Sequence, residues 1–258
     1  MDAPVEEIGG AYDAGVLFIC DHASPALPER YGRLGLPDAQ FERHIAYDIG
    51  AAALTRALAQ AFGAPAILTT FSRLLIDPNR GADDPTLVMR LSDGAIVPGN
   101  AGVDGAEIET RRRLFWQPYR DAVRQRLGAM RAAGPVPAIV SLHSFTPLWK
   151  GQPRPWEAAV LWDSDPRLAV PVLEALRAQG VCVGDNEPYD GALKGDTLYE
   201  HGTSTGLPHV LIEVRQDEIS EAEGVARWAG RLADVLRPVL ADPRTHMIEH
   251  YESRTARR

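Results

Sequence analysis

Short apolar runs alternate with longer amphipathic segments along most of this chain. The run at 16–22 is almost continuously apolar and ends in polar residues, which predicts a buried strand. Similar runs predict further strands at 66–71, 137–143, 158–163, 181–183 and 209–215. The segments between them predict helices at 38–62, 106–132, 166–179 and 220–236. This alternation is typical of an α/β protein with a mostly parallel sheet covered by helices on both faces.

Local signals support these boundaries. Asp38 is the expected N-cap of the first helix, and Ser220 with Glu223 forms a capping box for the last. That helix is expected to end before Pro238. The stretch 81–105 is rich in Gly, Asp and Pro and is long for a simple connection, so it predicts an active-site loop.

Bulk properties narrow the class of protein. With 258 residues and no clear linker, we expect a single catalytic domain (1–258) with its core at about 15–240 and a loose charged tail after Asp242. The formal net charge of −8 argues against nucleic acid as a partner. No run approaches the roughly 20 apolar residues of a membrane span. The first residues lack the order of a signal peptide, so a cytoplasmic enzyme is expected.

The two cysteines and an arginine cluster have structural interpretations. Cys20 and Cys182 give no disulfide framework, and both are expected to be buried free thiols. The run Arg111–Arg113 is expected to lie on the solvated face of its helix.

Two predicted strands end in histidines, far apart in the sequence. His22 follows Asp21 after the first strand, and His143 lies next to Ser144 at the end of another. Ligands and chemistry gather at the carboxyl ends of strands in α/β proteins, so both imidazoles are candidate metal ligands. Asp21 is a candidate co-ligand or a partner that orients the ring. Alternatively, each histidine only satisfies polar groups at the end of its strand.

Further polar residues extend this candidate site. His44 and Asp48 are four residues apart on the predicted helix 38–62, so they would share one face beside its apolar stripe. In that position the two side chains would either contribute directly to the site or only form a His–Asp hydrogen bond with each other. The segment Ser72–Arg80 presents two arginines and an asparagine after a strand, which favours a clamp for an acidic substrate. A structural Arg–Asp network through Asp77 is the alternative.

Glu213 lies within the apolar strand 209–215. A carboxylate partly buried at a strand end has a raised pKa and suits general-base catalysis on water. The alternative is an ion pair with Arg215, which lies two residues on and on the same face. The G-x-S-x-G match at 202–206 is not a nucleophile elbow, because Leu207, Pro208 and a strand follow where a helix is required.

Taken together, these motifs resemble the N-formylglutamate amidohydrolase family over about residues 15–240. The segments that carry the resemblance are Asp21–Ser24, His44–Ala51, Ser72–Arg80, Ser141–Ser144 and Ile212–Asp217. The resemblance implies a zinc carboxypeptidase-like, phosphorylase/hydrolase-like fold: a three-layer α/β/α sandwich with a mixed, mostly parallel sheet. It also implies a zinc-dependent hydrolase that acts on an N-acyl amino acid, with the formylglutamate activity belonging to histidine degradation.

The resemblance assigns roles to individual residues. His22 and His143 are the implied zinc ligands, for one zinc or another divalent metal per chain, and Glu213 is the implied general base. Zinc carboxypeptidases place a glutamate three residues after the first histidine, but Pro25 stands there in this chain. We take Asp48 as the third ligand, with Asp21 and His44 as alternatives.

The remaining roles concern the substrate, a small anionic N-acyl amino acid such as N-formyl-L-glutamate. The implied substrate contacts are Arg73, Asn79, Arg80 and Ser144, with Arg73 also stabilising the oxyanion. One alternative is a carboxypeptidase-like metallopeptidase, which would need an open groove instead of a closed pocket. Others are a non-catalytic amino-acid-binding relative without the metal and a structural α/β domain.

Overall fold

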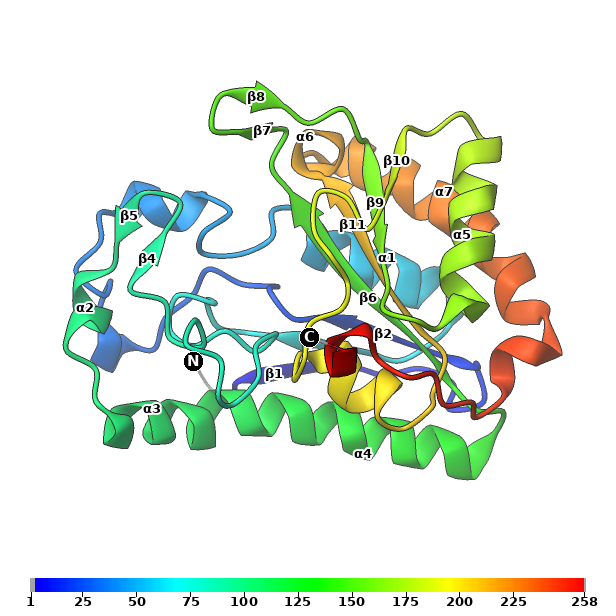
Figure 1. Ribbon diagram of the computed structural model, residues 1–258, viewed down its shortest axis with the longest axis horizontal. Coiled ribbons are helices and arrows are strands. Elements are labelled where there is room, and N and C mark those ends of the chain that lie inside the picture. Colours follow the sequence, from blue (N-terminus) through cyan, green and yellow to red (C-terminus); the bar gives the residue numbers. More distant parts are fainter. Residues whose placement is uncertain (1–2, 258) are drawn as a thin grey trace.

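A seven-stranded mixed sheet forms the centre of the protein (Figure 1). A computed structural model describes residues 3–257 and gives the strand order β1-β3-β2-β6-β11-β9-β10. The strands are β1 (Val5–Ile8), β2 (Val16–Cys20), β3 (Ala66–Thr69), β6 (Ala138–Phe145), β9 (Ala158–Leu161), β10 (Val183–Asp185) and β11 (His209–Arg215). Neighbours are parallel except that β1 is antiparallel to β3, and β11 is antiparallel to β9. Strand β1 was not among the strands predicted from the sequence.

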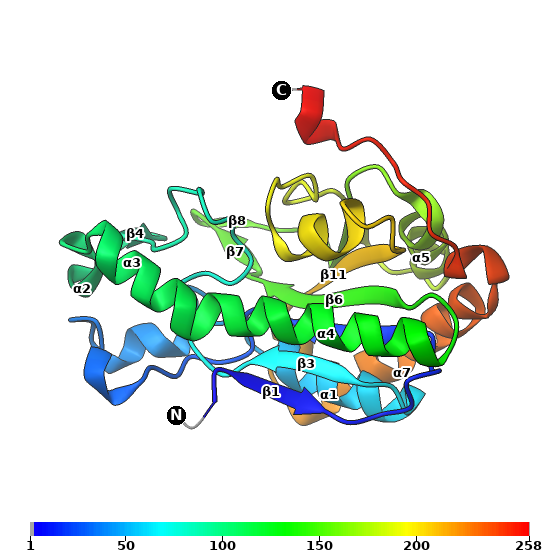
Figure 2. The ribbon, with the colours of Figure 1, turned by 90° about the horizontal axis from the view of Figure 1, so that it is seen from below.

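Alternate side chains of the strands pack into two separate layers. In β2, Val16 and Phe18 contact the apolar cluster on one face, whereas Leu17 and Ile19 contact the cluster on the other. Helices α1 (Ala51–Phe62), α5 (Pro166–Ala178) and α7 (Ala222–Ala241) cover the first face. Helix α4 (Gln117–Ala133) covers the second (Figure 2). The predicted three-layer α/β/α sandwich with a mixed sheet is therefore confirmed.

Shorter elements join these layers. The predicted helix 106–132 consists of α3 (Gly105–Arg111), one π-helical turn η3 (Arg112–Trp116) and α4. The stretch 81–105 contains a hairpin of β4 (Leu91–Ser92) and β5 (Ala95–Ile96), followed by α2 (Pro98–Ala101). A second hairpin consists of β7 (Leu148–Trp149) and β8 (Gln152–Pro153). The remaining elements are η1 (Glu29–Tyr31), η4 (Tyr199–Thr203), α6 (Gln216–Ile219), η5 (Pro243–His246) and η6 (Arg254–Arg257).

The prediction of one helix over 38–62 is wrong. Only a 3-10 turn, η2 (Asp38–Glu42), forms at its start, with Pro37 as N-cap, and α1 begins at Ala51. Gly50 sets this break because its φ is 82° and an added Cβ would lie 2.2 Å from the carbonyl oxygen of Ile219. The residues before it therefore form turns, so the shared helix face assumed for the polar pair at 44 and 48 does not exist.

Several smaller predictions need correction. Ser220 makes no capping bond to α7, whose N-cap is Glu221, and the helix continues through Pro238 to Ala241. Arg111 is not solvated but buried, because it donates to the carbonyl of Leu75 and to the Asn100 side chain. Tertiary contacts therefore overrode the local signals at these positions.

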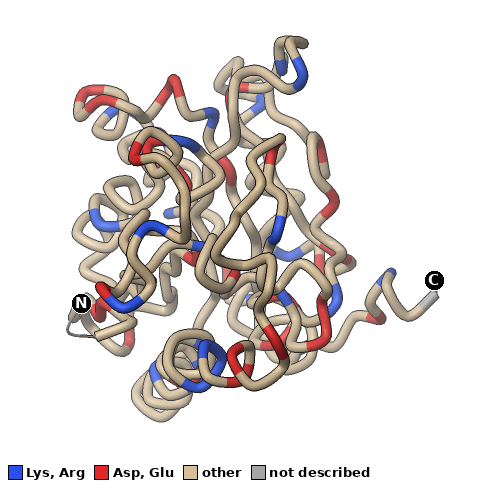
Figure 3. The backbone as a smooth tube through the Cα atoms, turned by 90° about the vertical axis from the view of Figure 1, so that its left-hand side faces the viewer, with Lys and Arg blue, Asp and Glu red and all other residues tan. Residues whose placement is uncertain are grey.

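Two more corrections concern the surface. Cys20 is buried as expected, but Cys182 is exposed. The tail is not loose throughout, since Arg254 donates to the carbonyl oxygens of Trp162 and Asp163. Acidic and basic positions are interspersed along the chain when one side is viewed (Figure 3). Among residues 3–257, every helix is too short or too polar to span a lipid bilayer.

Candidate metal centre and active-site pocket

The carboxyl ends of neighbouring strands bring the predicted site residues together. His22 follows the end of β2, and His143 lies near the end of the adjacent parallel strand β6. Glu213 on β11 stands opposite His143 in the parallel register. The segment Ser72–Arg80 follows β3, on the other side of β2. This is the edge at which open α/β sheets bind their ligands.

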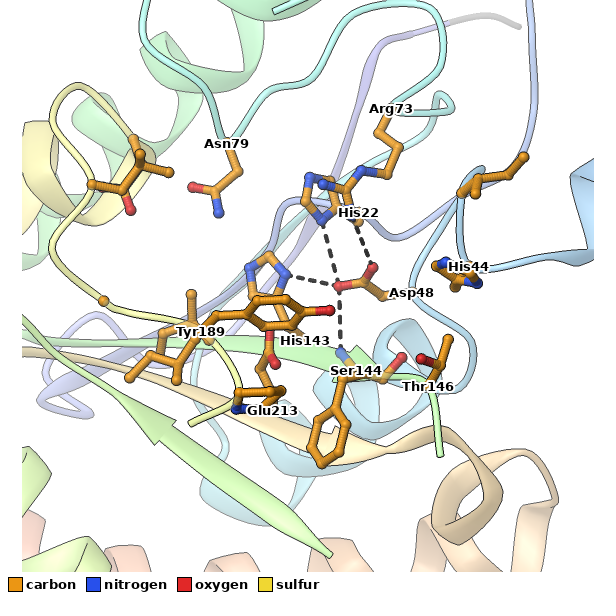
Figure 4. Close-up of a pocket in the computed structure, with 18 of the residues that line it drawn as sticks. His22, His44, Asp48, Arg73, Asn79, His143, Ser144, Thr146, Tyr189 and Glu213 are labelled. Carbon is orange, nitrogen blue, oxygen red and sulfur yellow. Dashed lines mark hydrogen bonds and ion pairs between the residues drawn. The ribbon is translucent and has the colours of Figure 1, made fainter. Parts of the chain in front are cut away.

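Three buried side chains form a cluster that could hold a metal ion. Ligand atoms of His22, Asp48 and His143 all lie within 4.8 Å of one another. Asp48 Oδ2 is 2.8 Å from His143 Nδ1 and 3.4 Å from His22 Nδ1 (Figure 4). His22 Nδ1 has no hydrogen-bond partner in the part of the chain that the structure describes. Two imidazoles and a carboxylate are the donor set of many catalytic zinc sites.

A second ring of carboxylates orients the two imidazoles. His22 Nε2 lies 2.7 Å from Asp77 Oδ1, and His143 Nε2 lies 3.0 Å from Asp21 Oδ2. Each Nδ1 is therefore turned toward Asp48. Carboxylate partners of this kind fix the ring and its tautomer at metal sites. The residues present thus fit a zinc ion, with Asp21 as an orienting partner of the ring.

The other alternative to Asp48 as the third ligand, His44, does not join this cluster. It lines the same pocket, but its Nε2 lies 3.5 Å from Asp93 Oδ2. Burial lowers the pKa of His44. Asp48 is held in the cluster by its backbone, because its N–H donates to the carbonyl of His22 at 2.9 Å.

The cluster and its carboxylate partners hold opposite charges close together in a buried space. Burial disfavours the charge of His143, but hydrogen bonds to Asp21 and Asp48 outweigh it and raise the pKa of His143 to about 10. Burial likewise disfavours the Asp21 carboxylate, yet its contacts with His143 lower its pKa to about 2. The pKa of Asp48 is also held below its usual range by His22 and His143. Both carboxylates are therefore ionised and ready to support a cation.

The arginines after β3 differ in their partners. Arg73 donates to Asp77 at 2.9 Å and lies 3.5 Å from Asp48 while also lining the pocket. The structural Arg–Asp network is therefore present, and it does not remove Arg73 from the pocket. Arg80 also lines the pocket, and its guanidinium donates to Thr86 Oγ1 at 3.3 Å and to the carbonyl of Asn79 at 3.0 Å. The backbone of Arg80 is anchored by Arg120, which donates to its carbonyl at 3.0 Å.

Glu213 is a buried carboxylate with a free oxygen. Its Oε2 has no hydrogen-bond partner among residues 3–257, and burial raises the pKa of Glu213 to about 7. The alternative ion pair with Arg215 does not form, because Arg215 binds Asp217 at 2.7 Å instead. Glu213 lines the same pocket as the histidine cluster. It is therefore placed to exchange a proton near the candidate metal centre.

Comparison with known proteins decides the family. The model of the N-formylglutamate amidohydrolase family matches residues 14–220. The chain belongs to this family. A solved structure, the gene product Atu2144 from Agrobacterium tumefaciens, is 34% identical with a TM-score of 0.88 and 93% of this chain and 95% of that chain covered.

A second solved structure agrees in fold with this member of the N-formylglutamate amidohydrolase family. It is the N-formylglutamate amidohydrolase from Ralstonia eutropha JMP134, with 20% identity, a TM-score of 0.66 and coverage of 95% of this chain and 100% of that chain. A search of curated proteins gives no match. Family membership makes the chain a hydrolase of the amide-cleaving class.

In this amidohydrolase, the cavity also contains residues that the sequence did not reveal. It has a volume of about 570 Å³ and is lined by Tyr189, Asp196 and Trp149 besides the predicted Asn79 and Ser144. Tyr189 extends its ring into the pocket near His143 and Glu213 (Figure 4). The 202–206 motif lies in η4 and a turn with no strand before it, so it forms no nucleophile elbow.

Proposed function

We propose that this protein is a zinc-dependent amidohydrolase that removes the formyl group, or another N-acyl group, from an acidic amino acid such as N-formyl-L-glutamate. The observation that supports it most is the cluster of His22, Asp48 and His143 beside the unpartnered carboxylate of Glu213. A metal site and a free base in one pocket are what metal-assisted hydrolysis of an amide uses.

The cluster residues would hold one zinc ion, which supplies Lewis acidity for the amide carbonyl and for the attacking water. Glu213 accepts the proton of that water as the new C–O bond forms. It then delivers the proton to the amide nitrogen as the C–N bond breaks, which yields formate and a free amino acid. Arg73 faces the pocket and would stabilise the negative charge that develops on the carbonyl oxygen.

The substrate would be oriented by its carboxylates. Arg80 lines the pocket and is held by the neutral acceptors Thr86 and Asn79, so its charge suits a bond to the substrate carboxylate. Asn79 and Ser144 line the same cavity, and Ser144 Oγ has no hydrogen-bond partner among residues 3–257. These donors would fix the amino-acid part of the substrate while its acyl group faces the cluster.

The first test is the zinc content of protein purified without chelator, measured by plasma mass spectrometry. We expect about one zinc per chain, which His143→Ala loses and His44→Ala keeps, because His44 lines the pocket outside the cluster. The zinc-loaded protein should then release formate from N-formyl-L-glutamate faster than from N-formyl-L-leucine. A wild-type protein that binds no zinc when the metal is added back would overturn the proposal and favour a non-catalytic binding relative.

A metallopeptidase acting on small peptides is the other enzyme candidate, and the cavity volume of about 570 Å³ is the observation that favours it. Hydrolysis of acyl dipeptides in preference to acyl amino acids would identify it. A role in histidine degradation is a proposal that rests on the family, and the cytoplasmic location stays a prediction.

A further inference from the structure

Two small hairpins flank the candidate active-site pocket. Ser92 and Asp93 of the β4–β5 hairpin line the cavity, as does Trp149 of the β7–β8 hairpin. Both hairpins stand outside the central sheet, with β4 and β5 at the left and β7 and β8 at the top of Figure 1. The two hairpins and Tyr189 form the rim of the pocket, and we call this set of residues the rim.

Exposed apolar side chains occur on both hairpins and at Tyr189, and two of them, Trp149 and Tyr189, line the pocket. Nine large hydrophobic residues are exposed among those that the structure describes, and five of them belong to the hairpins or to Tyr189. These five, with their exposed fractions, are Leu91 (62%), Ile96 (68%), Leu148 (56%), Trp149 (39%) and Tyr189 (42%). Apolar residues scattered singly on a surface need no explanation, but the aromatic pair Trp149 and Tyr189 lies on the wall of the pocket, where it can contact a ligand.

A buried arginine holds the aromatic part of the rim in place. Arg154 is only 8% exposed, and it donates to the hydroxyl of Tyr189 at 2.8 Å and to Thr146 Oγ1 at 3.1 Å. Its guanidinium carbon lies 5.0 Å from the ring centroid of Tyr189 and 5.3 Å from that of Trp149. The two rings are thus preorganised by cation–π contacts and a hydrogen bond, which lowers the entropic cost of binding an apolar group.

The cavity is larger than a formyl group requires. Its volume of about 570 Å³ lies within the range of about 300–1,000 Å³ that is typical of sites for drug-sized ligands. A formyl group would leave the apolar rim in contact with water. We propose that the rim binds an apolar N-acyl group larger than formyl, either an aliphatic chain or an aromatic ring. This inference rests on the proposed amidohydrolase function and specifies its substrate class.

The test compares N-formyl-, N-acetyl-, N-hexanoyl- and N-benzoyl-L-glutamate with the zinc-loaded enzyme. We expect kcat/KM for the hexanoyl or benzoyl substrate to exceed that for the formyl substrate at least tenfold. Trp149→Ala should reduce this ratio to below threefold. Tyr12→Ala is the matched control, because Tyr12 is 41% exposed and does not line the cavity, and it should keep the wild-type ratio. A formyl substrate that is preferred, or a ratio that Trp149→Ala leaves intact, overturns the inference.

A binding measurement separates failure of the rim from failure of the proposed function. Calorimetry of the zinc-loaded Glu213→Gln variant should show the hexanoyl compound binding at least tenfold more tightly than the formyl compound, with the difference lost when Trp149→Ala is added. If no compound is hydrolysed by the wild type but this difference is present, the amidohydrolase proposal fails and the rim is supported. Equal binding of the two compounds, or no binding of either, overturns the rim.

Discussion

His143 and Glu213 face each other across two parallel strands and leave the sheet on the same side. The register pairs Glu213 on β11 with His143 on β6. One residue belongs to the candidate metal cluster, and the other has a free carboxylate oxygen in the same pocket. The pairing therefore fixes a base beside the candidate metal without any flexible loop between them, which gives the site a rigid geometry.

Glu213→Gln should abolish most of the activity without removing the metal. The amide cannot accept a proton, and general-base catalysis contributes about 10²- to 10⁴-fold to such reactions, so kcat should fall by that order. Zinc content should stay at the wild-type value, because Glu213 lies outside the cluster. Glu223→Gln, an exposed change on α7, is the control. Full activity of Glu213→Gln would exclude Glu213 as the base.

Asp77→Asn should weaken zinc binding although Asp77 is not in the cluster. The substitution removes the negative charge that faces His22 Nε2 at 2.7 Å, and losses of about 10- to 100-fold in metal affinity are typical of such partners. Competition with a fluorescent zinc chelator measures the change. Asp93→Asn, near His44, should leave the affinity unaltered. An unchanged affinity in Asp77→Asn would show that Asp77 serves its contacts with Arg73 and the backbone of Asn79 and does not support the metal site.

Arg80→Gln should raise KM for an acidic N-acyl amino acid. Hydrogen bonds to charged groups contribute about 1.5–3 kcal/mol, so KM should rise about 10- to 100-fold while kcat changes less. Steady-state kinetics of the zinc-loaded protein give both constants. If kcat instead fell about 10- to 100-fold while KM stayed constant, Arg80 would act at the reacting carbonyl.

Asp196→Asn should stabilise the fold at neutral and higher pH. Burial raises the pKa of Asp196 to about 7, above the value of 3.8 for an unperturbed carboxyl. The native state then holds a proton that the unfolded chain has lost, so stability falls as the pH rises from about 4 through 7. The asparagine removes this dependence and keeps an oxygen to accept the N–H of Tyr199, which Asp196 Oδ1 meets at 2.6 Å.

Urea unfolding of both proteins from pH 4 to pH 8 tests this expectation. The difference in unfolding free energy, Asp196→Asn minus wild type, should grow with pH and reach the order of a few kcal/mol at the alkaline end. A difference that is constant across the range would mean that Asp196 does not retain its proton in the folded protein.

The sequence by itself determined the layers and the strand ends. Period-two alternation sends Leu17 and Ile19 to one face and Val16 and Phe18 to the other, and the same alternation sets His143 and Glu213 on one face. Because parallel strands of one sheet end at a common edge, local patterns place His22 and His143 at the same edge, and the pairing of β2 with β6 then brings them together.

Only the tertiary structure decided which carboxylate completes the cluster and what surrounds it. Asp48 was predicted for the wrong reason, since a close approach of Gly50 to Ile219 breaks the expected helix and a backbone bond to His22 places the carboxylate. The positions of Trp149 and Arg154 depend on contacts between segments distant in sequence, which leave no periodic signal. Local patterns fix which face a side chain takes, whereas partners across the chain fix which side chains meet.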